Sequence, residues 1–253
     1  MKLKDKIVVI TGSGGGIGEA CAHRFTAEGA KVVVTDIDPV GVERVSTAID
    51  SVGLAVDITV EGNVRAVADL ARRTYGAIDV WFSNAGVSGP RQPGDIPANS
   101  WWETSWQLHV MSHVYAAREV LPAMLERRGG YLLQTASVIG LTTQVDKAAY
   151  AVTKHAALAF SEWLAATYRR QGIKVSCFCP GAMVTPMLLA NNLPDDHPLL
   201  RTAPMPDEVA DRLVQAIDEE HFLIVDSRQG PDALLAKAAD YDRWLDGLAP
   251  PFS

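Results

Sequence analysis

The chain has 253 residues, of which 48% are hydrophobic, and this length allows one large α/β domain or two small ones. Its net charge is −7 and no long basic run occurs, which argues against a nucleic-acid partner. The first apolar run is too short for a signal peptide, and no stretch approaches membrane-spanning length. Three cysteines indicate a reducing compartment, so we expect a cytoplasmic protein with no membrane partner.

Short apolar runs alternate with longer helical patterns along the whole chain. The predicted strands are Ile7–Ile10, Lys31–Thr35, Leu54–Val56, Ala77–Phe82, a run that begins at Tyr131, Ile173–Phe178 and His221–Val225. The predicted helices are Ile17–Glu28, Pro39–Asp50, Glu61–Thr74, Ser100–Arg128, Ala149–Gln171, Asp207–Glu219 and Pro231–Leu248. Such alternation predicts a doubly wound (Rossmann) parallel sheet of about seven strands, with helices on both faces and right-handed crossovers.

No linker interrupts this alternation, so we predict a single dinucleotide-binding domain over residues 1–253. Residues 186–206 are rich in proline, leucine and asparagine, which favours a flap over the site. Residues 231–253 form a C-terminal helical extension whose function the sequence does not indicate.

A glycine-rich turn, Thr11–Gly18, follows the first predicted strand and opens the first predicted helix. Glycine lets the backbone approach a pyrophosphate, and the helix N-terminus supplies free N–H groups. This strand–turn–helix setting favours a phosphate-binding turn over a merely flexible one. We assign cofactor contacts in it to Gly12, Ser13, Gly14, Gly16, Ile17 and Gly18.

Asp36 ends the second strand, where a carboxylate would accept hydrogen bonds from the adenosine ribose and repel a 2′-phosphate. No arginine or lysine occurs at residues 13–15 or at Ile37, so we predict NAD rather than NADP as cofactor. Asp57 ends the third strand beside Ile58. Its carboxylate could bind adenine or cap the next helix, and the sequence favours neither. We place Asp36, Ile37, Asp57 and Ile58 in the cofactor site.

Tyr150 and Lys154 are four residues apart on one predicted helix and therefore share a face. Ser137 follows the strand that begins at Tyr131, so a strand end and a helix face can bring three polar groups together. An ammonium ~4 Å from a phenol would lower the phenol pKa by on the order of three units. Tyr150 could then exchange a proton with an alcohol or ketone while Ser137 holds the substrate oxygen.

Together these motifs resemble the short-chain dehydrogenase/reductase family in its single-domain, NAD-dependent branch, from about Lys6 to Val225. The family's N-A-G motif corresponds to Asn84, Ala85 and Gly86, and its P-G motif to Pro180 and Gly181, followed by Met183 and Thr185. The resemblance implies hydride transfer between a carbinol carbon and the nicotinamide ring. It makes Tyr150 the acid/base and Lys154 the group that lowers the tyrosine pKa and binds the nicotinamide ribose.

One position departs from the family, because its helix asparagine falls on His109. That asparagine helps to hold a water through its main-chain carbonyl, which any residue retains, so we expect activity to survive. A histidine can titrate near neutral pH, and it could extend the relay, fill the water site or touch substrate. The alternative is an NAD-binding homologue with weak or no catalysis. His109 and His113 lack a third ligand, so we predict no metal site.

The flap supplies mainly leucine and methionine, and no cluster of basic residues accompanies them. We therefore predict a mainly apolar substrate, a secondary alcohol or its ketone that could be cyclic or aromatic; an acidic group bound by Arg91 or Arg201 would contradict this. Residues Trp101, Trp102 and Trp106 could form an aromatic cage or, more simply, pack the helix.

The resemblance also implies a homodimer or homotetramer. We assign substrate contacts to Ser137, Tyr150, Ile139, Gln144 and Met187.

Overall fold

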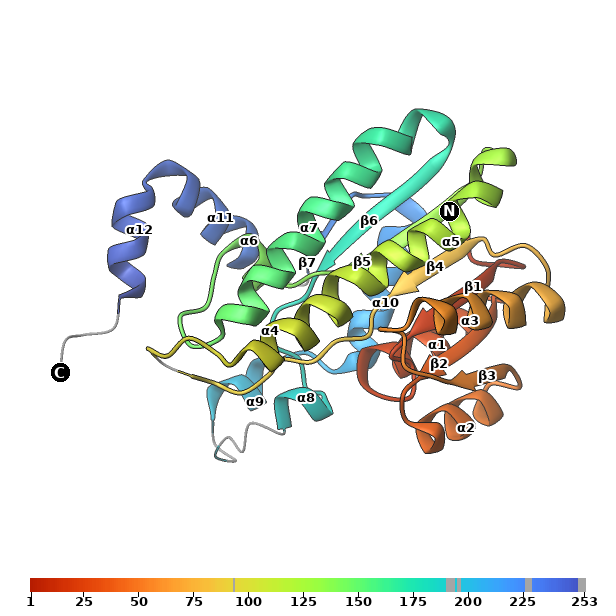
Figure 1. Cartoon of the computed structure of the whole chain (residues 1–253), viewed down its shortest axis with the longest axis horizontal. Coiled ribbons are helices and arrows are strands. Elements are labelled where there is room, and N and C mark those ends of the chain that lie inside the picture. The colour runs from red at the N-terminus through yellow and green to blue at the C-terminus, as the bar shows by residue number, and fades with distance from the viewer. Residues whose placement is uncertain (93, 190–193, 195–196, 226–228, 250–253) are drawn as a thin grey trace.

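A parallel sheet forms the centre of the computed structural model, which describes residues 1–92, 94–189, 194, 197–225 and 229–249 (Figure 1). Its strand order is β3-β2-β1-β4-β5-β6-β7, which confirms the doubly wound sheet. The strands are β1 (Ile7–Thr11), β2 (Lys31–Asp36), β3 (Val52–Ala55), β4 (Val80–Ser83), β5 (Gly130–Thr135), β6 (Ile173–Cys179) and β7 (Leu223–Val225). The winding reverses between β1 and β4, and in such sheets ligands bind at the carboxyl ends of the strands beside that reversal.

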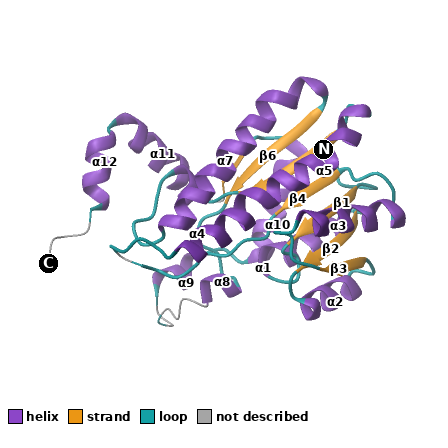
Figure 2. Ribbon diagram, viewed as in Figure 1, coloured by secondary structure: helices purple, strands orange, loops and turns teal. Residues whose placement is uncertain are grey.

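Helices cover both faces of the sheet (Figure 2). Alternate side chains of β1 show the division, because Val8 and Ile10 pack on one face and Val9 on the other. The first face carries α1 (Gly16–Ala27), α2 (Pro39–Ala48) and α10 (Pro206–Glu219). The second carries α3 (Glu61–Thr74), α5 (Ser112–Glu126) and α7 (Ala148–Tyr168), the last followed by the 3₁₀ turn η2 (Arg169–Gln171).

The single helix predicted over Ser100–Arg128 is in fact three segments. They are α4 (Asn99–Trp106), the π-helical turn η1 (Gln107–Met111) and α5. The amide of Ser112 donates to the carbonyl of Gln107, five residues back, which is the π pattern. Simple hydrophobic periodicity does not reveal such a turn, and π-turns are frequent at functional sites.

The helix predicted over Pro231–Leu248 is also divided, into α11 (Gln229–Ala239) and α12 (Tyr241–Leu248). Asp240 breaks it, because its backbone is extended and its carboxylate accepts a hydrogen bond from the Arg243 amide at 3.0 Å. In Figure 1, α12 lies away from the sheet.

Two short helices, α8 (Pro186–Leu189) and α9 (Pro198–Thr202), occupy the segment predicted as a flap; part of that segment, residues 190–193 and 195–196, lies outside the described residues. The amide of Val184 donates to the carbonyl of Pro204 at 3.1 Å and so joins the two ends of the segment. Within the described part of the chain, no helix has the length and apolar composition needed to cross a bilayer.

Candidate active site

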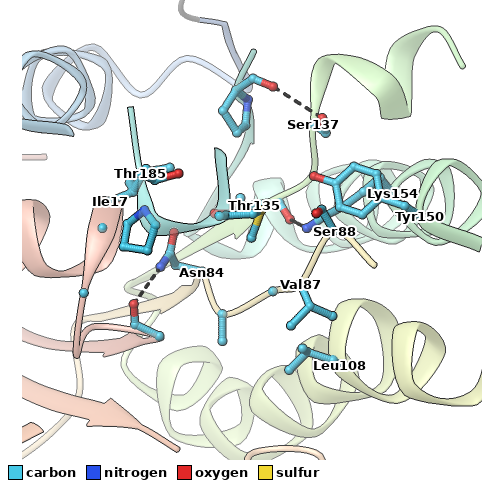
Figure 3. Close-up of a pocket in the computed structure, with 18 of the residues that line it drawn as sticks. Ile17, Asn84, Val87, Ser88, Leu108, Thr135, Ser137, Tyr150, Lys154 and Thr185 are labelled. Atoms are coloured by element: carbon cyan, nitrogen blue, oxygen red, sulfur yellow. Dashed lines mark hydrogen bonds between the residues drawn. The ribbon is translucent and has the colours of Figure 1, made fainter. Parts of the chain in front are cut away.

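A cavity of about 1070 Å³ opens along the carboxyl ends of the strands (Figure 3). It brings together almost all the predicted site residues. The predicted residues that line it are Gly12, Gly14, Gly16, Ile17, Asp36, Ile37, Asp57, Ile58, Asn84, Ala85, Gly86, Ser137, Ile139, Gln144, Tyr150, Lys154, Pro180, Gly181, Met183, Thr185 and Met187. Three predicted residues, Ser13, Gly18 and His109, do not line it.

The glycine turn at the start of α1 is shaped for a phosphate. Gly12 has a φ of +65°, and a Cβ there would lie 2.7 Å from the Cα of Ala85. Gly15 precedes α1 with no side chain capping the helix, and a Cβ on it would meet nothing within 4 Å. The first-turn amides of α1 therefore lack a side-chain acceptor beside the open space, so a dinucleotide pyrophosphate fits here.

Ser13 and Gly18 build this turn instead of lining the cavity. The Ser13 hydroxyl donates to the Ile10 carbonyl at 2.7 Å and accepts from the Thr35 amide at 2.9 Å, and its own amide donates to the Thr35 carbonyl. A Cβ on Gly18 would lie 2.1 Å from the Gly12 carbonyl oxygen. The structure thus gives both residues a packing role between β1, β2 and α1, in place of the predicted cofactor contacts.

Asp36 lies beside the glycine turn at the end of β2. Its carboxylate accepts hydrogen bonds from the amides of Gly14 at 3.0 Å and Asp38 at 3.1 Å, which fixes its orientation. The fold also brings Arg44 of α2 to the turn, where it donates to the Gly14 carbonyl at 2.9 Å. Arg44 pairs with Glu19 and does not line the cavity, whereas Asp36 does.

Asp57 does not cap α3, whose N-cap residue is Val60. One Asp57 oxygen accepts from both the amide and the hydroxyl of Thr59, at 2.9 Å and 2.7 Å. This local turn leaves Asp57 on the cavity wall beside Ile58. Of the two alternatives left open by the sequence, the geometry disfavours the helix cap.

Asn84 ties β4 to the glycine turn. Its side-chain amide donates to the carbonyls of Thr11 at 3.0 Å and Gly12 at 3.2 Å (Figure 3). The Thr11 hydroxyl in turn accepts from the amides of Asn84 and Ala85. These bonds hold together the strand ends at which the winding of the sheet reverses.

Ser137, Tyr150 and Lys154 lie together at one end of the cavity, away from Ile17 and Thr185 (Figure 3). Ser137 follows β5 and caps α6 (Val138–Leu141), its hydroxyl accepting from the Ile139 amide at 3.2 Å. Tyr150 and Lys154 project from the first turns of α7 into the same space. This is the juxtaposition that the Y-x-x-x-K spacing predicted.

The electrostatics of this group differ from the sequence-based expectation. Burial raises the pKa of the Tyr150 phenol, and the hydrogen bond from Ser137 offsets this only in part. Lys154 lies 5.7 Å from the tyrosine ring centre and donates to the Thr135 carbonyl at 3.0 Å. Burial lowers the pKa of Lys154 to about 8. The predicted fall of three units in the tyrosine pKa is therefore wrong for the protein by itself, because burial of the phenol raises its pKa more than the Ser137 hydrogen bond lowers it.

His109 lies behind this group, fully buried in η1. Its Nε2 accepts from the Val87 amide at 3.1 Å, which leaves the proton on Nδ1, 2.9 Å from the Thr153 hydroxyl. Burial, with the charge of Lys154, keeps the pKa of His109 well below its usual value. The expectation that this imidazole titrates near neutral pH is therefore wrong, and its hydrogen bonds join the β4 loop to α7.

A lysine that the sequence analysis did not select lies on the wall at the substrate end. Lys147 precedes α7, three residues before Tyr150, and is 7% exposed. It lines the cavity together with Gln144, Ile139 and Met187. Its place three residues before Tyr150 in the chain could have indicated it.

Trp101, Trp102 and Trp106 do not line the cavity, which disfavours the aromatic cage. Trp101 lies next to Gly89, where a Cβ would meet the indole ring at 3.6 Å. Trp106 is 43% exposed on α4.

Comparisons with known proteins agree with this geometry. The family model for short chain dehydrogenases matches residues 6–195. The 1-deoxy-11-beta-hydroxypentalenate dehydrogenase of Streptomyces exfoliatus is 37% identical over 196 residues, which are 74% of this chain and 71% of that protein.

Two solved structures are similar over most of the chain. One is a 7 alpha-hydroxysteroid dehydrogenase complexed with NADH and 7-oxo glycochenodeoxycholic acid, with a TM-score of 0.82 and 27% identity over 90% of this chain and 95% of that one. The other is a short chain dehydrogenase/reductase from Burkholderia phymatum in complex with NAD. Its TM-score is 0.82, with 26% identity over 100% of this chain and 98% of that one.

Proposed function

This chain belongs to the short-chain dehydrogenase family, and from that premise we propose that it is an NAD-dependent oxidoreductase acting on a mainly apolar secondary alcohol and its ketone. The observation that carries the proposal is the meeting of Ser137, Tyr150 and Lys154 in the cavity that also contains the glycine turn and Asp36. The NAD and NADH held by the two similar structures support the choice of cofactor.

Each residue has a role that follows from its contacts. Bound NAD would supply the hydride acceptor, and the glycine turn with Asp36 would hold its pyrophosphate and adenosine ribose. Tyr150 transfers the hydroxyl proton, and Ser137 orients the substrate oxygen beside the phenol. Lys154 would bind the nicotinamide ribose and stabilise phenolate, a role that needs its ammonium charged.

The raised pKa of the Tyr150 phenol affects ketone reduction and alcohol oxidation differently. Near neutral pH the phenol keeps its proton, which suits donation to a ketone oxygen. Alcohol oxidation needs the phenolate, so it should gain more from alkaline conditions. The same three residues serve both directions, and the physiological one is set by substrate supply.

The substrate end supports an apolar and bulky substrate. Ile139, Met187 and Leu188 contribute apolar walls to the cavity. The names of the relatives point the same way, since a pentalenate derivative and an oxo bile acid are polycyclic compounds. We therefore extend the proposal to an alicyclic alcohol.

The alternative of a non-catalytic NAD-binding homologue is less well supported. The argument for that alternative is the histidine at position 109. His109 does not line the cavity, whereas Ser137, Tyr150 and Lys154 all do. The named relatives are dehydrogenases and reductases, which also disfavours a pure binder.

Assembly into a homodimer or homotetramer remains part of the proposal. Trp163 is 54% exposed on α7 and stacks on Phe160, and Val152 of the same helix is 48% exposed. Exposed apolar groups on one helix are typical of subunit contacts. Light scattering should give at least twice the 27.2 kDa chain mass, and a monomer mass would remove this part.

The decisive experiment compares wild type with Tyr150→Phe on a panel of alicyclic secondary alcohols, following NADH formation. Removal of the phenol hydroxyl should abolish turnover, because it is the proton acceptor, while NAD still binds in a fluorescence titration. Ser137→Ala should also reduce turnover strongly. Full activity in Tyr150→Phe would overturn the mechanism.

A further inference from the structure

We propose that the substrate carries an anionic group, most simply a carboxylate, and that Lys147 binds it. This inference rests on the proposed function, because it uses the same cavity and names a second recognition point on the same substrate. The substrate is then held at two points. Tyr150 and Ser137 bind its carbinol oxygen, and the Lys147 ammonium binds its carboxylate. The apolar character predicted for the rest of the substrate is retained.

The burial of Lys147 is the first observation. The residue is 7% exposed although it lines the cavity. Within the described part of the chain its hydrogen bonds are made by its backbone, and its ammonium has neither an ion pair nor a hydrogen bond. Lysines are almost never this buried unless paired, so a lysine on the cavity wall whose ammonium lacks such a partner indicates an anionic partner from outside the chain.

The second observation is that the carboxylate of Asp146, the residue before Lys147, already accepts hydrogen bonds from two other side chains. One oxygen of Asp146 accepts from the Gln144 side chain at 2.7 Å, and the other accepts from Arg91 at 2.9 Å. The adjacent residue that could have neutralised Lys147 is thus held by two other donors. Arg91 itself is 49% exposed and lines the same part of the cavity, where its charge is balanced by Asp146.

Charge is distributed unevenly along the cavity. The part that follows β2 and β3 presents the carboxylates of Asp36, Asp38 and Asp57. The part that follows β4 and β5 presents Lys147 and Lys154, together with Arg91, which is paired with Asp146, and the exposed carboxylate of Glu103. An anionic substrate would therefore be attracted to the end that holds Tyr150 and repelled from the end proposed for adenosine.

The start of α7 brings the two recognition points to the same part of the cavity. Lys147 is the N-cap residue of α7, with a non-helical backbone, and Tyr150 lies in the first turn that follows it. Both residues line the cavity together with Ile139 and Met187, so the acid belongs near the carbinol carbon, with an apolar ring between them. The class is a cyclic hydroxy acid or the corresponding oxo acid.

The test uses matched probes: 4-hydroxycyclohexane-1-carboxylate and its methyl ester, with the equivalent decalin pair. In wild type the carboxylates should show KM values about tenfold lower than the esters, as expected for a hydrogen bond to a charged group. Lys147→Gln should remove that preference, so that acid and ester have similar KM values. Lys147→Arg should keep most of the preference for the carboxylates, because it retains the positive charge while changing the shape of the side chain.

A binding measurement makes the result independent of turnover. Tyr150→Phe loaded with NADH is titrated by calorimetry with 4-oxocyclohexane-1-carboxylate and with its methyl ester. The acid should bind about tenfold more tightly, and the difference should vanish when Lys147→Gln is added. Equal affinities, or no detectable binding of the acid, overturn the anion site. Turnover of neutral alcohols with no preference for acids overturns this inference and leaves the proposed function intact. Preferential binding of the acid without turnover of any alcohol would support the anion site and overturn the proposed function.

Discussion

The imidazole of His109 packs edge-on against the phenol ring of Tyr150, with ring centroids 5.5 Å apart and ring planes at 89°. The same imidazole accepts a hydrogen bond from the Val87 amide and donates one to Thr153, the residue immediately before Lys154 on α7. His109 therefore positions the helix that carries the proton-transfer group without facing the cavity. Edge-to-face contacts of this kind stabilise one ring orientation.

We predict that His109→Asn keeps turnover within about tenfold of wild type, because neither the phenol nor the ammonium is removed. The shorter amide can bond Thr153 but leaves the Val87 amide, at a part-buried position on the cavity wall, without its protein acceptor, which should cost roughly 0.5–1.5 kcal/mol of unfolding free energy. His109→Gln, whose oxygen reaches the position of Nε2, is the matched variant and should lose less stability. Denaturant unfolding and steady-state kinetics measure both effects. Complete loss of turnover in both variants, with NADH still bound, would make the histidine a direct participant.

The pH profile of ketone reduction should follow Lys154. Reduction needs a protonated phenol and a charged ammonium; burial raises the pKa of Tyr150 and lowers that of Lys154 to about 8. Activity should therefore stay level from about pH 6 to 7.5 and fall above about pH 8, as the ammonium loses its proton. Stopped-flow measurement of NADH oxidation at saturating ketone checks this. A rate that stays level through about pH 9.5 would show that the ammonium charge is not needed.

His113 should make the protein sensitive to acid. It is 1% exposed, neither ring nitrogen has a hydrogen-bond partner among the described residues, and burial lowers its pKa from 6.5 to about 3. Because the folded-state pKa is the lower one, the unfolded chain takes up the proton first and stability falls as pH falls below about 6.5. Between pH 7 and 5 this residue should cost about 2 kcal/mol of unfolding free energy.

His113→Phe should remove that part of the loss, so its stability should change less between pH 7 and 5 than that of wild type. Urea unfolding at the two pH values gives the difference directly. His23→Phe, at an exposed position on α1, is the control and should leave the pH dependence unchanged. Equal pH dependence in all three proteins would contradict the assignment.

Cofactor choice should depend on the charge of Asp36. Asp36→Asn retains an acceptor for the Gly14 amide, which lies 3.0 Å from the carboxylate, but removes the negative charge. We expect the ratio of kcat/KM for NAD to that for NADP to fall by about tenfold or more, because a 2′-phosphate is no longer repelled. An unchanged ratio would mean that another group sets the preference, and Arg44 would be the first residue to examine.

The strand–helix alternation and the motif spacings are local properties of the chain, and they suffice to predict the sheet and most of the cavity wall. Periods of two and 3.6 residues decide which side chains face the core, whatever lies on the far side. The Y-x-x-x-K spacing places Tyr150 and Lys154 on one face for the same reason. The interruptions at η1 and Asp240 were not predicted, because each depends on a hydrogen bond that periodicity does not encode.

What the sequence determined by itself was therefore the doubly wound sheet and the identity of the groups that meet in its crevice. Tertiary structure decided how each polar group is partnered. It placed hydrogen bonds between Ser13 and Thr35 and between His109 and Val87, and it set Lys147 on the cavity wall with no counter-ion among the described residues. Desolvation and hydrogen-bond partners come from segments far apart in the chain, so pKa values and side-chain roles become definite only after the chain has folded.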